Sequence, residues 1–112
     1  MPPVPYQLPP SFSNCQDDPN FGQAPNYPVL IVKVNKDTDV VTLKNVSPDA
    51  VSLDGWHMCS IKGNQQHPIS GSLASYEQRD FPDPEASIWS KSDADPGALY
   101  DPEGRLVAYW PD

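Results

Sequence analysis

The sequence predicts an all-β fold, a sandwich of about seven short antiparallel strands. Short runs rich in β-branched and aromatic residues are separated by clusters of Pro, Gly, Asn, Asp and Ser, which recur about every 8–12 residues. No segment places apolar residues at the 3.6-residue spacing of an amphipathic helix. With 112 residues, the chain has room for one sizeable hydrophobic core.

Proline divides the chain into two parts. Eight of the 15 prolines lie within residues 1–28, where their missing N–H groups exclude a mostly helical structure. We therefore interpret residues 1–28 as a Pro-rich linker or tail and residues 29–112 as the folded domain. A linker of this kind holds a module at a semi-rigid distance from its neighbour. We expect the chain to be one part of a larger protein.

The first predicted strands form a hairpin. Residues 29–34 are a β-branched run, residues 40–44 alternate apolar and polar side chains, and turn-forming residues lie between them. Residues 47–50, with Pro and Asp in the central positions, predict the next turn. Within residues 51–61, an Asp-Gly pair predicts a tight bend or bulge, because glycine adopts positive φ at little cost.

The second half is predicted as short strands separated by loops. Residues 67–70 are interpreted as an edge strand because they contain a proline. Residues 73–81 lack apolar periodicity and precede two prolines, so we expect irregular structure with one short strand. Beyond an Ile-Trp pair, the last hairpin joins residues 98–100 to 105–110 through the turn sequence Asp-Pro-Glu-Gly.

The net charge is −8 and is concentrated toward the C-terminus. Residues 76–112 carry nine acidic side chains against three basic ones. Nucleic-acid binding requires a basic patch that neutralises phosphates, and the basic residues of this sequence do not cluster. The composition argues against a nucleic-acid partner, and no apolar run reaches the ~20 residues of a membrane span.

The two cysteines, Cys15 and Cys59, are too few for a disulfide framework, and metal-binding CxxC spacing is absent. Cys59 lies near Trp56 and Met58 in the sequence and is most simply a small buried hydrophobe. The alternative is a bridge between Cys15 and Cys59, which would fix the N-terminal segment to the domain in an oxidising compartment.

Two motifs of the sequence resemble the lamin tail domain family. A strand ending in leucine-x-asparagine precedes an aliphatic-x-leucine-x-glycine-tryptophan segment, and a later tryptophan precedes a leucine-x-aspartate-x-x-glycine-x-x-valine ending. The resemblance covers about residues 29–110. It departs from the family at residues 72–84, which are polar and Pro-rich where many members carry an aliphatic strand. The motif residues are Leu43, Asn45, Leu53, Gly55, Trp56, Trp89, Leu99, Asp101, Gly104 and Val107.

This resemblance implies an immunoglobulin-like β-sandwich, a bacterial-type member of the family and a non-catalytic module. In nuclear lamins the domain makes protein contacts, and DNA binding is also attributed to it. In bacteria, similar domains are attached to secreted or surface-associated proteins, often nucleases or other hydrolases. That context favours an extracellular or cell-surface location over a cytoplasmic one. The chain lacks coiled-coil heptads, so a filament-forming lamin is not indicated, and we expect a monomer.

Catalytic and metal-binding chemistry has little support in the sequence. His57 and Cys59 share a strand face, but no third group is placed to orient them, so no catalytic residue and no cofactor are predicted. Asp93, Asp95 and Asp101 offer the oxygen ligands that calcium prefers. Glycine occupies one ligand position of the calcium-loop pattern, so these residues are candidates for a low-affinity site or form a solvated acidic loop.

The sequence therefore predicts a non-catalytic interaction or accessory domain, tethered to a larger protein of the secreted hydrolase or nuclease kind. Its partner is expected to be a protein that binds at an edge strand or at a loop end. The alternative is a ligand-binding module for carbohydrate or calcium. That module would use the acidic loop together with aromatic side chains at the surface. Most of the candidate aromatic side chains are, however, expected in the core. These side chains are Trp89, Tyr100, Tyr109 and Trp110, of which Trp110 is the best candidate for exposure.

Overall fold

The structure is a computed structural model that describes residues 21–62, 65–82 and 89–112. In these ranges it contains nine β-strands and one 3-10 turn, η1 (Phe21–Gln23). The strands are β1 (Val29–Asn35), β2 (Val40–Asn45), β3 (Val51–Ser52), β4 (His57–Ser60), β5 (Gln65–Pro68), β6 (Ser72–Leu73), β7 (Gln78–Pro82), β8 (Gly97–Tyr100) and β9 (Leu106–Trp110).

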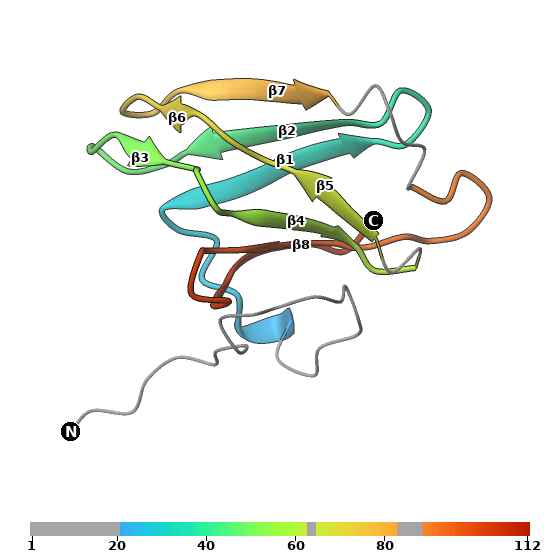
Figure 1. Cartoon of the computed structure of the whole chain (residues 1–112). Helices are drawn as coiled ribbons and strands as arrows, with labels where there is room; N and C mark the ends of the chain where they lie inside the picture. Colours follow the sequence, from blue (N-terminus) through green and yellow to red (C-terminus); the bar gives the residue numbers. More distant parts are fainter. Residues whose placement is uncertain (1–20, 63–64, 83–88) are drawn as a thin grey trace.

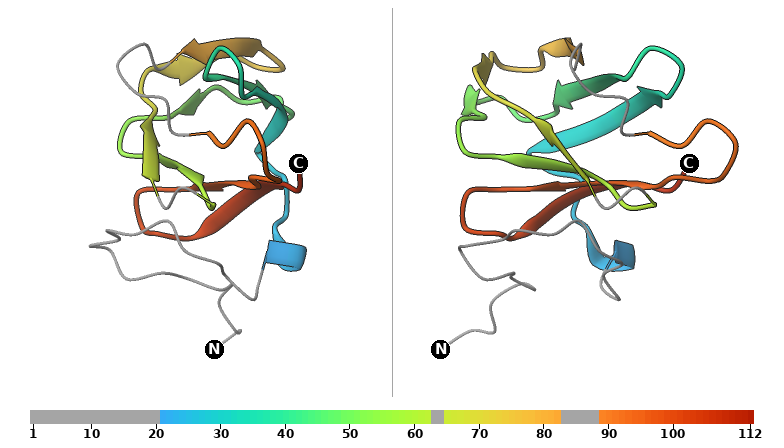
Figure 2. Two further views of the ribbon diagram at one scale, coloured as in Figure 1. Left: turned by 90° about the vertical axis from the view of Figure 1, so that its right-hand side faces the viewer. Right: turned by 45° about the vertical axis from the view of Figure 1, so that its right-hand side comes forward.

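The strands form two main sheets and one short ribbon. The first sheet has the order β1-β2-β7, the second has the order β5-β4-β8-β9, and β3 pairs with β6. Every pair is antiparallel. Figures 1 and 2 show the two sheets as separate layers, with β1, β2 and β7 above β4 and β8. The predicted all-β sandwich is confirmed.

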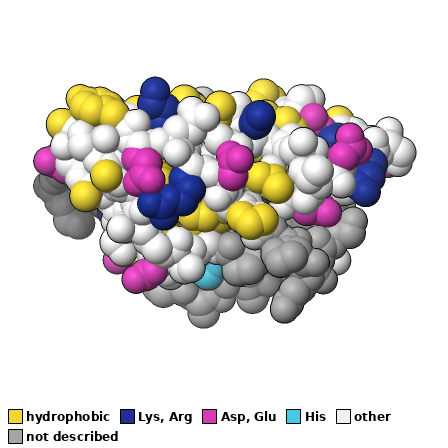
Figure 3. Space-filling view, turned by 90° about the horizontal axis from the view of Figure 1, so that it is seen from above, with side chains coloured by type: hydrophobic (Ala, Val, Ile, Leu, Met, Phe, Trp, Pro, Cys, Tyr) yellow, Lys and Arg dark blue, Asp and Glu magenta, His cyan; other side chains and the backbone are white. Residues whose placement is uncertain are grey.

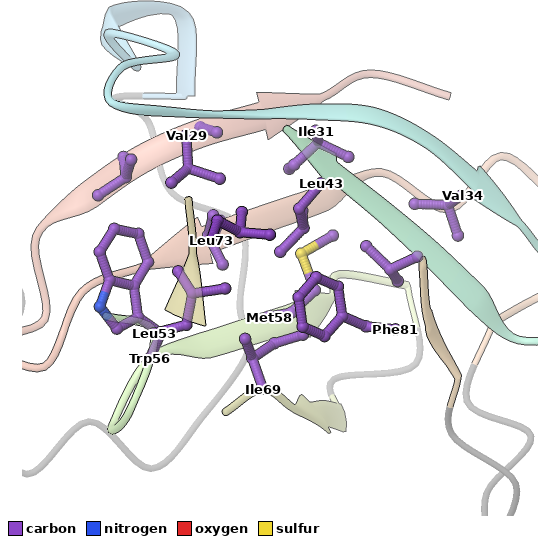
Figure 4. Packing of buried hydrophobic residues seen from close by; sticks show 14 of the residues in the cluster. Val29, Ile31, Val34, Leu43, Leu53, Trp56, Met58, Ile69, Leu73 and Phe81 are labelled. Atoms are coloured by element: carbon purple, nitrogen blue, oxygen red, sulfur yellow. The ribbon is translucent and has the colours of Figure 1, made fainter. Parts of the chain in front are cut away.

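The main core fills the space between the two layers. In β2, Val41 and Leu43 point inward because successive side chains alternate between the two faces of a strand. Met58 of β4 and Leu99 of β8 lie opposite each other in the second sheet and meet these residues from below. Figure 4 shows the packing of this cluster, including Trp56.

Both predicted hairpins are confirmed. β1 pairs with β2, with a register shift between Ile31 and Lys33. β8 pairs with β9 through a turn in which Gly104 adopts a φ of 79°. The predicted bend before β4 is present, with Gly55 at a φ of 82°. β5 lies at the edge of its sheet, as its proline predicted.

The prediction for residues 73–81 is wrong in part, because this region contributes to two strands. β6 is a two-residue strand opposite β3, and β7 is a full edge strand that pairs along β2. Of the residues of β7, Phe81 is buried and the others are exposed. An edge strand with a single buried residue has no apolar alternation, which explains why the pattern did not reveal it. Ile88, of the predicted Ile-Trp pair, lies outside the described residues.

Candidate interaction surface

A tight turn at residues 74–77 presents an exposed tyrosine beside β7. The N–H of Glu77 donates to the carbonyl of Ala74 (3.0 Å), and the N–H of Ala74 donates to Oε1 of Glu77 (2.8 Å). Tyr76 has a φ of 59°, and its side chain is 58% exposed. This backbone conformation favours glycine or asparagine, and a bulky residue in it costs on the order of 1–3 kcal/mol.

β7 has one open edge. The N–H of Asn45 donates to the carbonyl of Glu77 (2.8 Å), which fixes the alternation of hydrogen-bonded pairs along β2 and β7. In that alternation Arg79 and Phe81 direct their backbone groups to β2, whereas Gln78 and Asp80 direct theirs away from it. Pro82, which has no N–H, also occupies an outward-directed position. Within the described part of the chain, no strand pairs with this side of β7.

Charged side chains flank this edge. Nη2 of Arg79 lies 2.7 Å from Oε2 of Glu77, and Thr42 donates its hydroxyl to Oδ1 of Asp80 (2.6 Å). The N–H of Ala74 and then the Arg79 guanidinium lower the pKa of Glu77 below its usual value. Charged residues and proline at a sheet edge oppose indiscriminate pairing with other chains, and the β7 edge carries both.

The outer face of the β1-β2-β7 sheet adjoins the edge. The register places Leu30 opposite Lys44, and Lys33 opposite Thr42. Val32, next to the register shift, is 38% exposed. Figure 3, which views this side of the molecule, shows hydrophobic patches interspersed with Lys, Arg, Asp and Glu side chains. The face is thus mixed in character and carries no extended patch of one charge.

Asn45, a residue of the leucine-x-asparagine motif, is fully buried and connects two turns. Its side-chain amide donates to the carbonyls of Asp49 (2.7 Å), Leu73 (3.3 Å) and Ala74 (3.0 Å). Its Oδ1 accepts from the N–H (2.9 Å) and the hydroxyl (2.8 Å) of Ser47. Asn45 therefore holds the 47–49 bend against the chain segment that leads into the Tyr76 turn, so this motif residue positions the candidate surface.

The other motif residues have structural positions in the core and its turns. Gly55 has a φ of 82°, which side chains rarely adopt, and a Cβ there would make a tight contact of 3.3 Å with the Pro102 side chain. The Asp101 carboxylate accepts from the N–H groups of Glu103 (3.0 Å) and Arg105 (2.9 Å) and closes the Gly104 turn. The remaining motif side chains are buried: Leu43, Leu53, Trp56, Trp89, Leu99 and Val107.

The three candidate calcium ligands have separate positions. The buried Asp95 carboxylate accepts from the Ser60 hydroxyl (2.7 Å) and from the N–H groups of Lys62 (2.9 Å) and Ser90 (2.7 Å). Asp101 forms an ion pair with Nε of Arg105 (2.8 Å). Asp93 is exposed, and its carbonyl accepts from the Lys36 ammonium group (2.9 Å). In residues 21–62, 65–82 and 89–112, no three His, Cys, Asp or Glu side chains come together in a way that could hold a metal ion.

The remaining sequence candidates lie as follows. Cys59 is buried and disulfide-bonded, so it is not the thiol that a nucleophilic pair with His57 would need. The other cysteine of the chain, Cys15, lies outside the described residues. Trp89 is buried, and Trp110 is partly buried against it, in an edge-to-face contact with ring centroids 6.4 Å apart.

The other two aromatic candidates are also covered, Tyr100 fully and Tyr109 in part. Tyr27 and Tyr76 are instead exposed, although no sequence pattern indicated either of them. For Tyr76 no local pattern gave a signal, because a Ser-Tyr pair is not typical of a turn with positive φ.

Comparison of the chain with protein-family models and with curated proteins finds no match. In the part of the chain that the structure covers, no helix is long and apolar enough to cross a membrane.

Proposed function

We propose that this chain is a non-catalytic interaction domain that binds an extended polypeptide segment along the open edge of β7. The observation that carries the proposal is Tyr76, an exposed aromatic residue at positive φ directly before an edge strand. A segment that adds to a sheet edge gains main-chain hydrogen bonds, and side-chain contacts beside the edge supply its specificity.

The unfavourable backbone of Tyr76 supports a role in binding. An exposed tyrosine in the left-handed region contributes little packing and destabilises its turn, whereas Gly or Asn would fit without strain. Tyrosine is also among the residues that most often dominate binding energy at protein interfaces. Beside β7, its ring could contact an added segment while Gln78 and Asp80 provide outward-directed backbone groups.

We further propose that the domain is an immunoglobulin-like sandwich of the lamin tail type that acts as an accessory module of a larger protein. The support is that the motif residues have structural roles: Asn45 joins two turns, Gly55 fits against Pro102, and Trp56 is buried in the core. Residues at this motif spacing therefore form the framework on which the β7 edge is presented.

A phage-displayed library of linear peptides, selected against the folded chain, tests the binding proposal. Selected peptides are expected to shift the amide resonances of residues 76–80 in ¹⁵N-labelled protein. Tyr76→Asn should weaken their binding at least about tenfold, the usual effect of removing an aromatic anchor. Val32→Thr, on the opposite edge strand of the same sheet, is the matched control and should bind like the unmodified protein.

Two results would contradict the proposal. One is selected peptides that bind equally well to Tyr76→Asn and to the unmodified protein. The other is peptide-induced shifts confined to the β5-β4-β8-β9 sheet, which would place the binding surface on the other layer.

A further inference from the structure

Asp80 is the middle one of the three outward-directed positions on the open edge of β7. Gln78 and Asp80 direct both an N–H and a carbonyl away from β2, whereas Pro82 offers a carbonyl alone. A segment that adds antiparallel, like the described strands, would form closely hydrogen-bonded pairs at Gln78 and at Asp80. The residue opposite Asp80 would then lie about 5.5 Å from it between Cα atoms, with both side chains on the outer face of the sheet.

The charges of Glu77 and Arg79 compensate each other. Both oxygens of the Glu77 carboxylate accept hydrogen bonds, Oε1 from the N–H of Ala74 (2.8 Å) and Oε2 from Nη2 of Arg79 (2.7 Å). Nε of Arg79 also donates to Oε2 of Glu77 (3.2 Å). The turn before β7 and the first part of its edge therefore present little net charge to a partner.

The charge of Asp80 is not compensated in this way. Asp80 is exposed, and its Oδ1 accepts from the Thr42 hydroxyl (2.6 Å), which is a neutral donor. Among the residues that the structure describes, no ion pair includes Asp80, so Oδ2 is available to an incoming cation. Lys33 and Lys44 lie on β1 and β2, so β7 separates them from the side on which a segment would add (Figure 1).

Two wider features also favour a basic partner. Residues 76–112 carry nine acidic side chains against three basic ones, and the resulting negative field attracts cationic segments. The exposed ring of Tyr76, next to the same edge, offers a face that attracts ammonium and guanidinium groups. These features favour positive charge anywhere in the segment, whereas Asp80 specifies one position.

We infer that the segment bound at β7 runs antiparallel to this strand and carries a lysine or arginine opposite Asp80. The inference rests on the binding proposed above and names the chemistry of the partner, a basic extended polypeptide. An acidic residue at the same position would face Asp80 directly, and like charges opposite each other destabilise a sheet.

The test is a double-mutant cycle in which the probes are linear peptides selected against the full chain. Each Lys and Arg of a peptide is replaced in turn by Gln, and every peptide is titrated against the unmodified protein and against Asp80→Asn. The asparagine keeps an oxygen that can accept from the Thr42 hydroxyl, so this variant retains the contact with β2. Asp37→Asn is the matched control, because it removes the same charge from an exposed turn.

One basic residue of the peptide is expected to couple to Asp80. Its replacement by Gln should weaken binding to the unmodified protein about two- to fivefold, the range of an exposed ion pair, and should leave binding to Asp80→Asn unchanged. Asp37→Asn should bind every peptide as the unmodified protein does. A spin label at the peptide N-terminus should broaden the amide resonance of Phe81 more than that of Gln78, because the strands are antiparallel.

The outcomes separate this inference from the binding on which it rests. Peptides that shift residues 76–80 but contain no basic residue coupled to Asp80 would overturn the inference alone. Equal effects of Asp37→Asn and Asp80→Asn would also overturn it, because net charge would then explain the preference. Stronger broadening of Gln78 than of Phe81 would overturn the antiparallel direction. Peptides that shift only residues outside 76–80 would overturn both the inference and binding at β7.

Discussion

At the scale of single residues, Asn45 is held by hydrogen bonds at both the amide nitrogen and the amide oxygen of its side chain. Five hydrogen bonds at 0% exposure connect it to the 47–49 bend and to residues 73 and 74. Replacing its amide with a carboxylate of the same shape would place negative charge against three carbonyl oxygens. The buried amide is therefore needed as a donor and not only as a space-filling group.

Asn45→Asp is expected to lower the free energy of unfolding by at least about 3 kcal/mol, because it removes the donors and adds a buried charge. The measurement is urea denaturation followed by tryptophan fluorescence. Asn35→Asp is the matched control, since Oδ1 of Asn35 only accepts from the N–H groups of Asp37 and Thr38. A carboxylate can also accept these bonds, so the control should change stability by less than about 0.5 kcal/mol. Equal losses in the two variants would refute this account of Asn45.

Tyr76→Asn is expected to raise the free energy of unfolding by up to about 1 kcal/mol, because asparagine tolerates positive φ and the tyrosine side chain is exposed. Tyr76→Val should lower it, because a β-branched residue fits this conformation poorly. Thermal unfolding monitored by circular dichroism distinguishes the two. If Tyr76→Asn is more stable than the unmodified protein and loses peptide binding, Tyr76 serves binding. If Tyr76→Asn is less stable, Tyr76 serves the stability of the fold, which would contradict this account.

At the scale of elements, the predictable strands are those with a buried face. β1 follows from its β-branched run and β2 from its alternation, whereas β8 follows from the Asp-Pro-Glu-Gly turn after it. Gly55 and Gly104 mark bends that require positive φ. β7 could not be predicted in the same way. Its strand conformation depends on pairing with β2, and its exposed residues carry no periodic signal. The candidate surface was missed for the same reason, since it consists of the turn and edge that lack a pattern.

Two proline substitutions test the assigned direction of the β7 backbone. Gln78→Pro removes an N–H that points away from β2 and should cost less than about 1 kcal/mol of stability, whereas Arg79→Pro removes a β2-directed N–H and should cost about 1–3 kcal/mol or more. Chemical denaturation of both variants gives the comparison. A larger loss for Gln78→Pro would show that the alternation along β7 is reversed, and similar losses would contradict the assignment.

At the scale of the whole molecule, one carboxylate joins three distant parts of the chain. Oδ2 of Asp112 accepts from the Lys36 ammonium group (2.6 Å) and from the N–H of Asp95 (2.7 Å). It thereby connects the turn of the first hairpin, the acidic loop and the residues after β9. The Lys36 side chain and then the Asp95 N–H lower the pKa of the Asp112 carboxyl.

This lowered pKa predicts a pH-dependent contribution to stability. A carboxyl with a depressed pKa in the folded state stabilises the protein at pH above its unfolded value, near 4, and this contribution disappears as pH falls through the folded value. Asp112→Asn should therefore be less stable than the unmodified protein at pH 7, with the difference shrinking below pH 4. Denaturation midpoints across this range provide the measurement, and Asp37→Asn, in the same hairpin turn, is the control. A difference that grows on acidification would contradict the assignment.

The central claim is that β7 presents an open edge for an extended segment, and amide hydrogen exchange measured residue by residue tests it most directly. In the unbound protein, Gln78 and Asp80 should exchange rapidly while Arg79 and Phe81 are protected. On addition of a selected peptide, the Gln78 and Asp80 amides should slow at least about tenfold, as expected for newly formed hydrogen bonds. Gln78 and Asp80 amides that are already protected in the unbound protein, or that remain fast with peptide bound, would contradict the claim.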